Sequence, residues 1–228
     1  GLPISCYGID IQDDTADILR ATAEIGMLTK MGGGTAGYFG KIRHRGAPIK
    51  NNGVSNGSVA MMLPFQTITD TITQGQARRG YFAAYHDIEH PDIEEFLECR
   101  SEGSPIQDIA LAVCISDDFM IRAEKGDKNA RRILTKVHKK RSETGFPYIF
   151  FKDNVERGKP QVYKDKNMVI NHSQMCTEII EYTDAEKTFV CCLSSLNLLH
   201  FDEWKDTDAI ETLTYFLDVV YTEFIQNA

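Results

Sequence analysis

The chain has 228 residues, of which 42% are hydrophobic and 25% are charged, a balance typical of a globular domain with its own core. A net charge of -8 disfavours binding to a nucleic-acid polymer or an acidic membrane, because either polyanion would be repelled. No apolar run reaches the roughly 18 residues of a membrane-spanning helix. Six cysteines without a signal-peptide pattern indicate a reducing, cytoplasmic setting.

Short apolar runs alternate with helical patterns along the chain, which predicts an α/β fold. The helices are expected after Asp13 as N-cap, ending at the glycines 32–34, then over 59–72 with an interruption at Pro64, and from Pro91 to about Arg100. The strands are expected at residues 2–9, 81–85, 106–115, 146–151 and 188–193. The glycine-rich segment from Gly32 to about Ser58 is expected to be a functional loop.

Two charged stretches could suggest binding surfaces, but both keep apolar residues at helical spacing. Residues 122–141 hold nine Lys or Arg against two acids, and the spacing of Ile133, Leu134 and Val137 predicts an amphipathic helix with a solvated basic face. The last 28 residues hold seven acids and a single Lys205, and they are expected to form an acidic surface helix. Neither stretch therefore requires a nucleic-acid partner.

One segment matches a metal-site pattern. His86-Asp87-Ile88-Glu89-His90 fits H-x-x-E-H, in which two histidines one helical turn apart on one helix bind zinc. Pro91 disfavours helical geometry at His90, and the residues up to Tyr85 have the pattern of a strand. The segment is better explained as a strand-to-helix connection, and a zinc hydrolase built on His86, Glu89 and His90 is kept as the weaker alternative.

The cysteines fall into two groups. Two lie on a predicted helix and a predicted strand and are expected to be small buried side chains: Cys99 and Cys114. Cys176 lies in a stretch without periodicity, two residues before Glu178, and is a candidate for radical or nucleophilic chemistry. Cys191 and Cys192 are adjacent on a predicted strand, so only one of them can face a given site. Cys6 lies on the first predicted strand, and spacing alone does not show that these thiols meet.

Seven short motifs follow one another along the chain, at residues 2–6 (LPISC), 40–49 (GKIR and GAPI), 55–57 (SNG), 74–80, 90–93 (HPDI), 175–179 (MCTEI) and 191–198 (CCLSSLNL). In order and spacing they resemble the catalytic large subunit of ribonucleotide reductase. The residues around Cys176 are most similar to the aerobic class I enzymes rather than to the cobalamin-dependent class.

The resemblance implies a ten-stranded α/β barrel of two five-stranded parallel half-sheets with a central finger loop. Residues 1–228 would be a partial catalytic barrel domain: the first half-barrel, the finger loop near 171–180 and the start of the second half. Cys176 matches the thiyl-radical cysteine that abstracts the 3' hydrogen, and Glu178 matches the carboxylate that accepts the 3' hydroxyl proton. Cys6 and Cys191 match the redox pair that ends as a disulfide. Gln174 stands where the family usually has Asn, one methylene shorter.

Nucleotide-binding positions also follow from the resemblance. Ser5 matches a substrate-binding position, and Arg78 is the contacting side chain of the loop 74–80, which couples effector identity to the substrate base. Asp13 and Arg43 match positions beside the specificity effector, which would be ATP or a deoxynucleotide. Without the resemblance, Arg43 would be explained as an ordinary solvated loop charge.

The resemblance further implies which partners the chain needs. It is expected to bind no cofactor of its own and to receive a radical from a subunit with a dimetal centre. A thioredoxin or glutaredoxin-type reductant, the remainder of the large subunit and assembly into a homo-oligomer are also expected, in the supply of deoxyribonucleotides for DNA replication. The second half-barrel, the radical-relaying tyrosine pair and the C-terminal cysteines are not among these residues, so we expect an excerpt of a longer chain or a split-gene product. The alternative is a non-catalytic effector-binding or assembly module.

Overall fold

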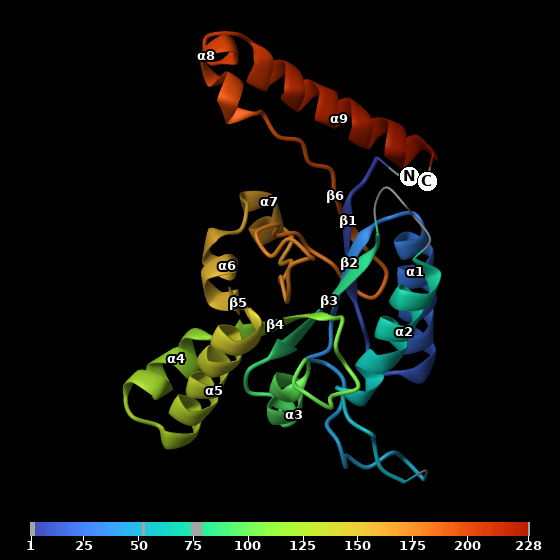
Figure 1. The fold of residues 1–228 in the computed structure, drawn as a ribbon, viewed down its shortest axis with the longest axis vertical. Coiled ribbons are helices and arrows are strands. Elements are labelled where there is room, and N and C mark those ends of the chain that lie inside the picture. Colours follow the sequence, from blue (N-terminus) through green and yellow to red (C-terminus); the bar gives the residue numbers. More distant parts are fainter. Residues whose placement is uncertain (1–2, 52, 74–78, 228) are drawn as a thin grey trace.

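The computed structural model describes residues 3–51, 53–73 and 79–227, which form a six-stranded sheet of order β5-β4-β3-β2-β1-β6 (Figure 1). Five neighbouring strands are parallel: β1 (Cys6–Asp10), β2 (Gly34–Tyr38), β3 (Tyr81–Asp87), β4 (Ala110–Ile115) and β5 (Tyr148–Phe151). The sixth, β6 (Phe189–Cys191), pairs with β1 in the antiparallel direction. The predicted α/β class and a five-stranded parallel sheet are confirmed.

Helices make the crossovers that parallel strands require. Those between successive parallel strands are α1 (Thr15–Lys30), α2 (Leu63–Ile72), α3 (Ile93–Glu98), α4 (Asp117–Glu124) and α5 (Lys128–Thr144). After β5, the last parallel strand, the chain forms the helices α6 (Lys152–Gly158), α7 (Gln161–Asp165), α8 (Phe201–Trp204) and α9 (Ala209–Asn227). Short 3-10 turns precede α2 at Ala60–Met62 and α8 at Leu198–His200.

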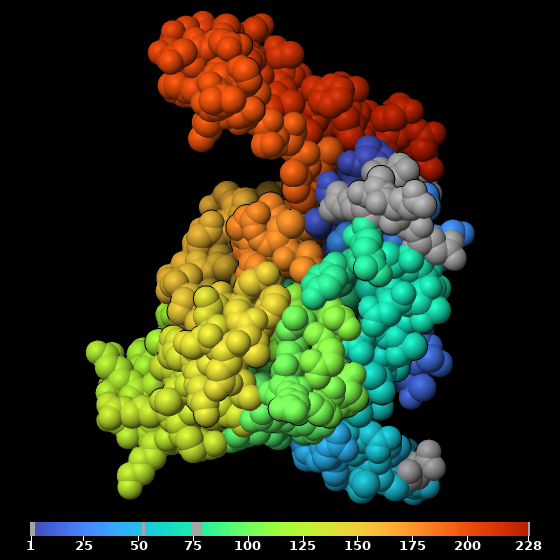
Figure 2. Space-filling model, viewed as in Figure 1, coloured from blue at the N-terminus to red at the C-terminus, as the bar shows by residue number. Residues whose placement is uncertain are grey.

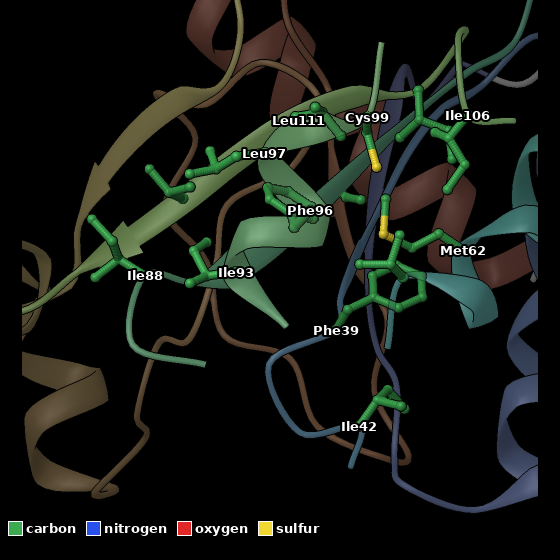
Figure 3. Packing of buried hydrophobic residues seen from close by; sticks show 14 of the residues in the cluster. Phe39, Ile42, Met62, Ile88, Ile93, Phe96, Leu97, Cys99, Ile106 and Leu111 are labelled. Atoms are coloured by element: carbon green, nitrogen blue, oxygen red, sulfur yellow. The ribbon is translucent and has the colours of Figure 1, made fainter. Parts of the chain in front are cut away.

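The two faces of the sheet carry different side chains, because neighbouring residues of a strand point to opposite faces. One face packs large apolar residues against the helices, with Phe39, Met62 and Phe96 in the cluster drawn in Figure 3. The other face is lined by small residues and two tyrosines, among them Ala36, Ala83, Ala112, Tyr38 and Tyr85. On this second face, called the inner face below, Ile170, Met175 and Ile180 of the segment between α7 and β6 pack. The small residues leave room for that segment.

Strand β2 was not expected, since Gly34–Tyr38 was assigned to a long loop. Its glycines remove the usual strand signal, yet they are required by the neighbours of the strand. A Cβ at Gly37 would lie 2.7 Å from Cδ1 of Ile11, and one at Gly34 would lie 3.2 Å from Sγ of Cys6. The expected loop is therefore confined to the residues after Tyr38.

Other boundaries also differ from the predictions. The N-cap of α1 is Asp14, whose side chain accepts hydrogen bonds from the backbone N–H groups of Ala16 and Asp17, and not Asp13. Strand β1 begins at Cys6, whereas the expected start, Leu2, lies outside the described residues. Strand β4 begins at Ala110 rather than at residue 106.

The basic stretch forms two helices instead of one, because α4 ends at Glu124 and Asp127 caps α5. Its basic side chains face α3, where Lys136 lies 3.0 Å from Glu94 and 2.8 Å from Glu98, and Lys140 lies 2.7 Å from Glu98. These pairs hold the pKa of Glu98 at about 2. The apolar spacing correctly predicted an amphipathic helix, since Ile133 and Val137 of α5 are buried, while the ion pairs with α3 were not predicted.

The C-terminal acidic helix is present as α9, which follows β6 and returns to it at Tyr221, whose hydroxyl accepts from the Cys192 backbone N–H at 2.8 Å (Figures 1 and 2). None of its described side chains is buried, and Phe216, Val219 and Ile225 are each more than half exposed. Cys99 and Cys114 are buried, as predicted. Across the described residues, the helices are too short or too polar to cross a membrane.

Candidate active site

Two cysteines meet where β6 pairs with β1. The antiparallel register places Cys6 directly opposite Cys191, and each side chain is only 3% exposed. Cβ atoms of directly opposed residues lie about 4.5–5.5 Å apart, and a disulfide needs about 3.5–4.5 Å. Neither cysteine is in a disulfide, and a small movement of the edge strand separates this reduced arrangement from one. Cys192 points away and is half-buried, in agreement with the predicted alternation.

A third cysteine reaches the same place from the segment that covers the inner face. Residues 172–174 are fully buried, and the chain then turns outward so that Cys176 is half-buried. Sγ of Cys176 lies 3.7 Å from Sγ of Cys6. Cys6, Cys176 and Cys191 therefore converge from three separate segments, a meeting that spacing alone did not predict. We call residues 172–180 the finger loop.

Burial affects the protonation of Cys191, one of the two opposed cysteines. Desolvation raises the pKa of the Cys191 thiol above its ordinary value, because the thiolate would lose its hydration. At neutral pH this residue is a thiol that can give up hydrogen, and not a thiolate nucleophile. The environment fits reductive chemistry better than acyl transfer.

The finger loop also carries the two other residues expected at the site. The side chain of Gln174 is fully buried and lies beside the Cys191 thiol, whose pKa it acts to lower against the effect of burial. Glu178 lies on the same turn as Cys176, its backbone N–H donating to the Cys176 carbonyl oxygen over 2.5 Å, and its side chain is exposed. Ser5, next to Cys6, donates its backbone N–H to the Cys191 carbonyl oxygen over 2.9 Å.

The expected effector residues lie beyond the opposite end of β1. Nε of Arg43 lies 2.7 Å from Oδ2 of Asp13, and the Arg43 backbone N–H also donates to Asp13. The pair lines a surface hollow of about 370 Å³ with Lys50, Ser55 and Asn56. The structure thus joins Asp13 to Arg43 and supplies a basic and two polar side chains around them. Arg78 lies outside the described residues.

The zinc alternative is not supported. His86 belongs to β3, where Nε2 is 2.9 Å from Oγ of Ser58, and His90 follows the strand with Nε2 2.8 Å from the carbonyl oxygen of Ile42. Burial lowers the pKa of His86 to about 4. Nowhere in residues 3–51, 53–73 and 79–227 do three His, Cys, Asp or Glu side chains cluster as metal ligands would.

Two residues that the sequence reasoning missed support the finger loop. The Tyr85 hydroxyl donates to the Gln174 carbonyl oxygen over 2.6 Å, and Nδ1 of His172 lies 2.6 Å from the Ser173 carbonyl oxygen. Tyr85 falls on a predicted strand, and His172 lies four residues before Cys176. Neither position carries a motif, so only the fold identifies them.

Comparison with known proteins places this chain in a family. A family model described as ribonucleotide reductase, barrel domain, matches residues 4–129 and 124–226. The chain belongs to the ribonucleotide reductase barrel family. The resemblance of the seven motifs is thereby confirmed.

The relatives are much longer than this chain. The putative ribonucleoside-diphosphate reductase large subunit of Frog virus 3 is 34% identical, over all of this chain and 43% of the relative. Ribonucleoside-diphosphate reductase subunit alpha of Bacillus subtilis is 27% identical, over 99% of this chain and 40% of the relative. The solved alpha subunit of the class Id ribonucleotide reductase of Actinobacillus ureae is 50% identical, with a TM-score of 0.92 over all of this chain and 42% of that one. The chain thus spans less than half the length of each of these relatives.

Proposed function

We propose that this chain contributes the thiol site of a ribonucleotide reductase large subunit, which reduces ribonucleotides, in the first place ribonucleoside diphosphates, to deoxyribonucleotides. The observation that carries the proposal is the convergence of three cysteines. Cys6 lies opposite Cys191 in the sheet and 3.7 Å from Cys176 at its Sγ. A packing role would not require three thiols from three distant segments to meet, which disfavours a non-catalytic module.

The chemistry assigns a different task to each group. Cys176, as a thiyl radical, takes the 3' hydrogen of the ribose, and Glu178 accepts the proton of the 3' hydroxyl. The 2' hydroxyl leaves as water with a proton from the Cys6 and Cys191 pair. The second hydrogen of that pair goes to the 2' carbon, so the pair supplies two electrons and two protons in all and ends as a disulfide, while Cys176 returns its hydrogen to the 3' carbon and becomes a thiyl radical again. The raised pKa of Cys191 supports this role, because it keeps hydrogen on the sulfur at neutral pH.

Two further side chains fit substrate and effector. The buried Gln174 amide lies beside Cys191 and offers a donor and an acceptor that are suited to the hydroxyls of the sugar. In the hollow at Asp13 and Arg43, the carboxylate would accept from ribose hydroxyls, and Arg43 would pair with phosphate. Ser5, beside Cys6, and Arg78 are proposed as substrate contacts.

The proposal includes partners that this chain does not supply. A small subunit with a dimetal centre would generate the radical, and a thioredoxin or glutaredoxin-type protein would reduce the disulfide again. The remainder of the large subunit would complete the barrel. We place the assembly, a homo-oligomer, in the cytoplasm, where the thiols stay reduced between turnovers.

The test uses the whole large subunit with its small subunit and a reductant. Cys176→Ala should abolish deoxynucleotide formation and leave the affinity for effector nucleotides within about twofold. Cys191→Ala should also abolish multiple turnover, whereas Cys192→Ala, on the neighbouring residue that points away, should retain most of it. Wild-type turnover in Cys176→Ala would exclude the proposal.

A further inference from the structure

Two side chains hold the point where the finger loop leaves the protein interior. Tyr85 of β3 donates its hydroxyl to the Gln174 carbonyl oxygen, and His172 donates from Nδ1 to the Ser173 carbonyl oxygen, each over 2.6 Å. Both rings are 0% exposed. The bonds fix two consecutive carbonyl groups immediately before the turn that carries Cys176. We call residues 172–174 the loop base.

The protonation states make both bonds permanent at neutral pH. Burial lowers the pKa of His172 to about 4, so the ring is neutral at pH 7. A carbonyl oxygen can only accept, and the single ring proton must therefore be on Nδ1. Burial also raises the pKa of Tyr85, whose hydroxyl keeps its proton. Each donor is thus present over the whole physiological range of pH.

Ring packing leaves His172 little freedom to move. Its ring is stacked on Tyr38 of β2, with centroids 5.8 Å apart and an interplanar angle of 4°. It also contacts the rings of Tyr85 on β3 at 5.5 Å and Phe189 on β6 at 5.8 Å. Phe189 lies two residues before Cys191 on the same strand. His172 therefore ties the loop base to the strand that carries one thiol of the redox pair.

A shift of the loop base would move the third thiol. The Gln174 carbonyl oxygen, held by Tyr85, also accepts from the Thr177 backbone N–H at 3.2 Å, which closes the turn around Cys176. Thr177 has a φ of 51°, a left-handed conformation that a threonine adopts only when its surroundings impose it. The turn is therefore held in place by the loop base, which is itself held by Tyr85 and His172.

We propose that Tyr85 and His172 are positioning residues that place the Cys176 thiol against the redox pair. Neither is proposed to touch substrate or the reacting atoms, and both act through backbone carbonyl groups. The inference rests on the proposed function, because it concerns how the radical cysteine of that reaction is held in place. Displacements of about 1 Å in a reacting group can lower a rate by about a hundredfold.

The first test compares two tyrosines of β3 in the whole large subunit with its small subunit. Tyr85→Phe keeps the ring and removes the donor to Gln174, and kcat should fall by about ten- to a hundredfold with KM within about twofold. The control is Tyr81→Phe, since the Tyr81 hydroxyl accepts from the Arg100 guanidinium at 3.5 Å instead of donating to the finger loop. It should keep kcat within about twofold.

The second test separates hydrogen bonding from packing at residue 172. His172→Asn keeps an N–H donor near the position of Nδ1, whereas His172→Leu fills similar space without one. The Asn variant should recover most of the kcat that the Leu variant loses. In a single turnover of pre-reduced enzyme, the yield of the disulfide between Cys6 and Cys191 should fall in step with kcat.

The outcomes separate this inference from the proposed function. If wild-type enzyme forms no deoxynucleotide, the proposed function fails. If wild-type enzyme is active and Tyr85→Phe keeps its kcat, the positioning role is wrong. It is also wrong if His172→Asn and His172→Leu lose the same activity, because packing alone would then explain the loss.

Discussion

Asp92 ties the segment before α2 to the start of α3, and its removal should loosen the wall of the hollow at Asp13 and Arg43. Its carboxylate accepts from the Arg45 backbone N–H at 3.0 and 3.1 Å, from the Ser58 backbone N–H at 2.8 Å and from the Ser58 hydroxyl at 2.9 Å. Asp92 is 7% exposed and Ser58 is 0% exposed. The segment between these anchors contains Ser55 and Asn56, which line the hollow.

The expected magnitude follows from the donors that Asp92→Ala would leave buried. Asp92→Ala would leave the buried Ser58 backbone N–H without its acceptor, which costs about 1–3 kcal/mol, whereas the Ser58 hydroxyl can turn to Nε2 of His86, 2.9 Å away. We therefore expect the free energy of local opening to fall by about 2 kcal/mol, which is about thirtyfold more frequent opening.

Hydrogen exchange followed by mass spectrometry measures this opening in peptides that cover residues 43–58, and titration of effector nucleotide measures its effect on the hollow. The matched control is Glu95→Gln, since Glu95 pairs with the Arg45 guanidinium at 2.6 Å while 38% of its side chain is exposed. An exposed pair contributes about 1 kcal/mol or less, so exchange should change by less than about fivefold. Equal exchange in the two variants would refute the reasoning.

The same contact sets a dependence on pH. Burial acts to raise the pKa of Asp92, but hydrogen bonds from the backbone N–H groups of Arg45 and Ser58 and from the Ser58 hydroxyl outweigh it and hold the pKa below the ordinary 3.8. A carboxyl with a depressed folded-state pKa stabilises the fold above its unfolded pKa, and this contribution is lost as the pH falls through the folded value. Wild type and Asp92→Ala should therefore converge below about pH 4.

Three further outcomes are expected. A Cβ at Gly8 would lie 2.1 Å from two ring carbons of Phe189, so Gly8→Ala should push β6 away from β1 and cost about 1–3 kcal/mol of stability. The yield of the diamide-induced disulfide between these strands, measured by mass spectrometry, should then fall severalfold. The control is Gly158→Ala, because Gly158 has open space around it. Burial lowers the pKa of His86 to about 4 from 6.5, so the ring is neutral in the fold. Up to about 3 kcal/mol of stability should therefore be lost as the pH falls from 6.5 to 4. Thermal unfolding of His86→Gln should lack that part of the pH dependence. Zinc titration should show the same uptake for wild type and for His90→Ala, and a stoichiometric site that disappears in the variant would contradict the structure.

Strands were predictable where the apolar pattern alone decides the structure. Residues 110–115 form a strand buried on both faces, and an unbroken apolar run indicates such a strand. Strand β2 was not predicted, because its glycines lower the strand propensity of the segment. Those glycines lie close to the side chains of Ile11 and Cys6, a tertiary contact that local propensity does not show. By residue type, Asp13 and Asp14 are equally good N-caps. In the structure Asp14 caps α1, while Asp13 pairs with Arg43.

The candidate site was predictable in its residue types but not in its geometry. Alternation along a strand showed that only one of Cys191 and Cys192 can face the interior. The register that places Cys191 opposite Cys6 joins distant parts of the chain, and the resemblance, rather than the spacing, indicated that pair. The support from Tyr85 and His172 depends on packing around the finger loop, which no local pattern encodes.

The adjacent cysteines at the end of β6 bear on the register between β6 and β1. Three residue pairs join β6 to β1 at the edge of the sheet, and the Phe189 ring over Gly8 and the Tyr221 hydroxyl bound to the Cys192 backbone N–H also hold the strand. A slip by one residue turns every side chain of a strand to the opposite face. With Cys192 next to Cys191, a slip in one direction would still place a cysteine opposite Cys6, whereas a strand with a single cysteine would lose that pairing.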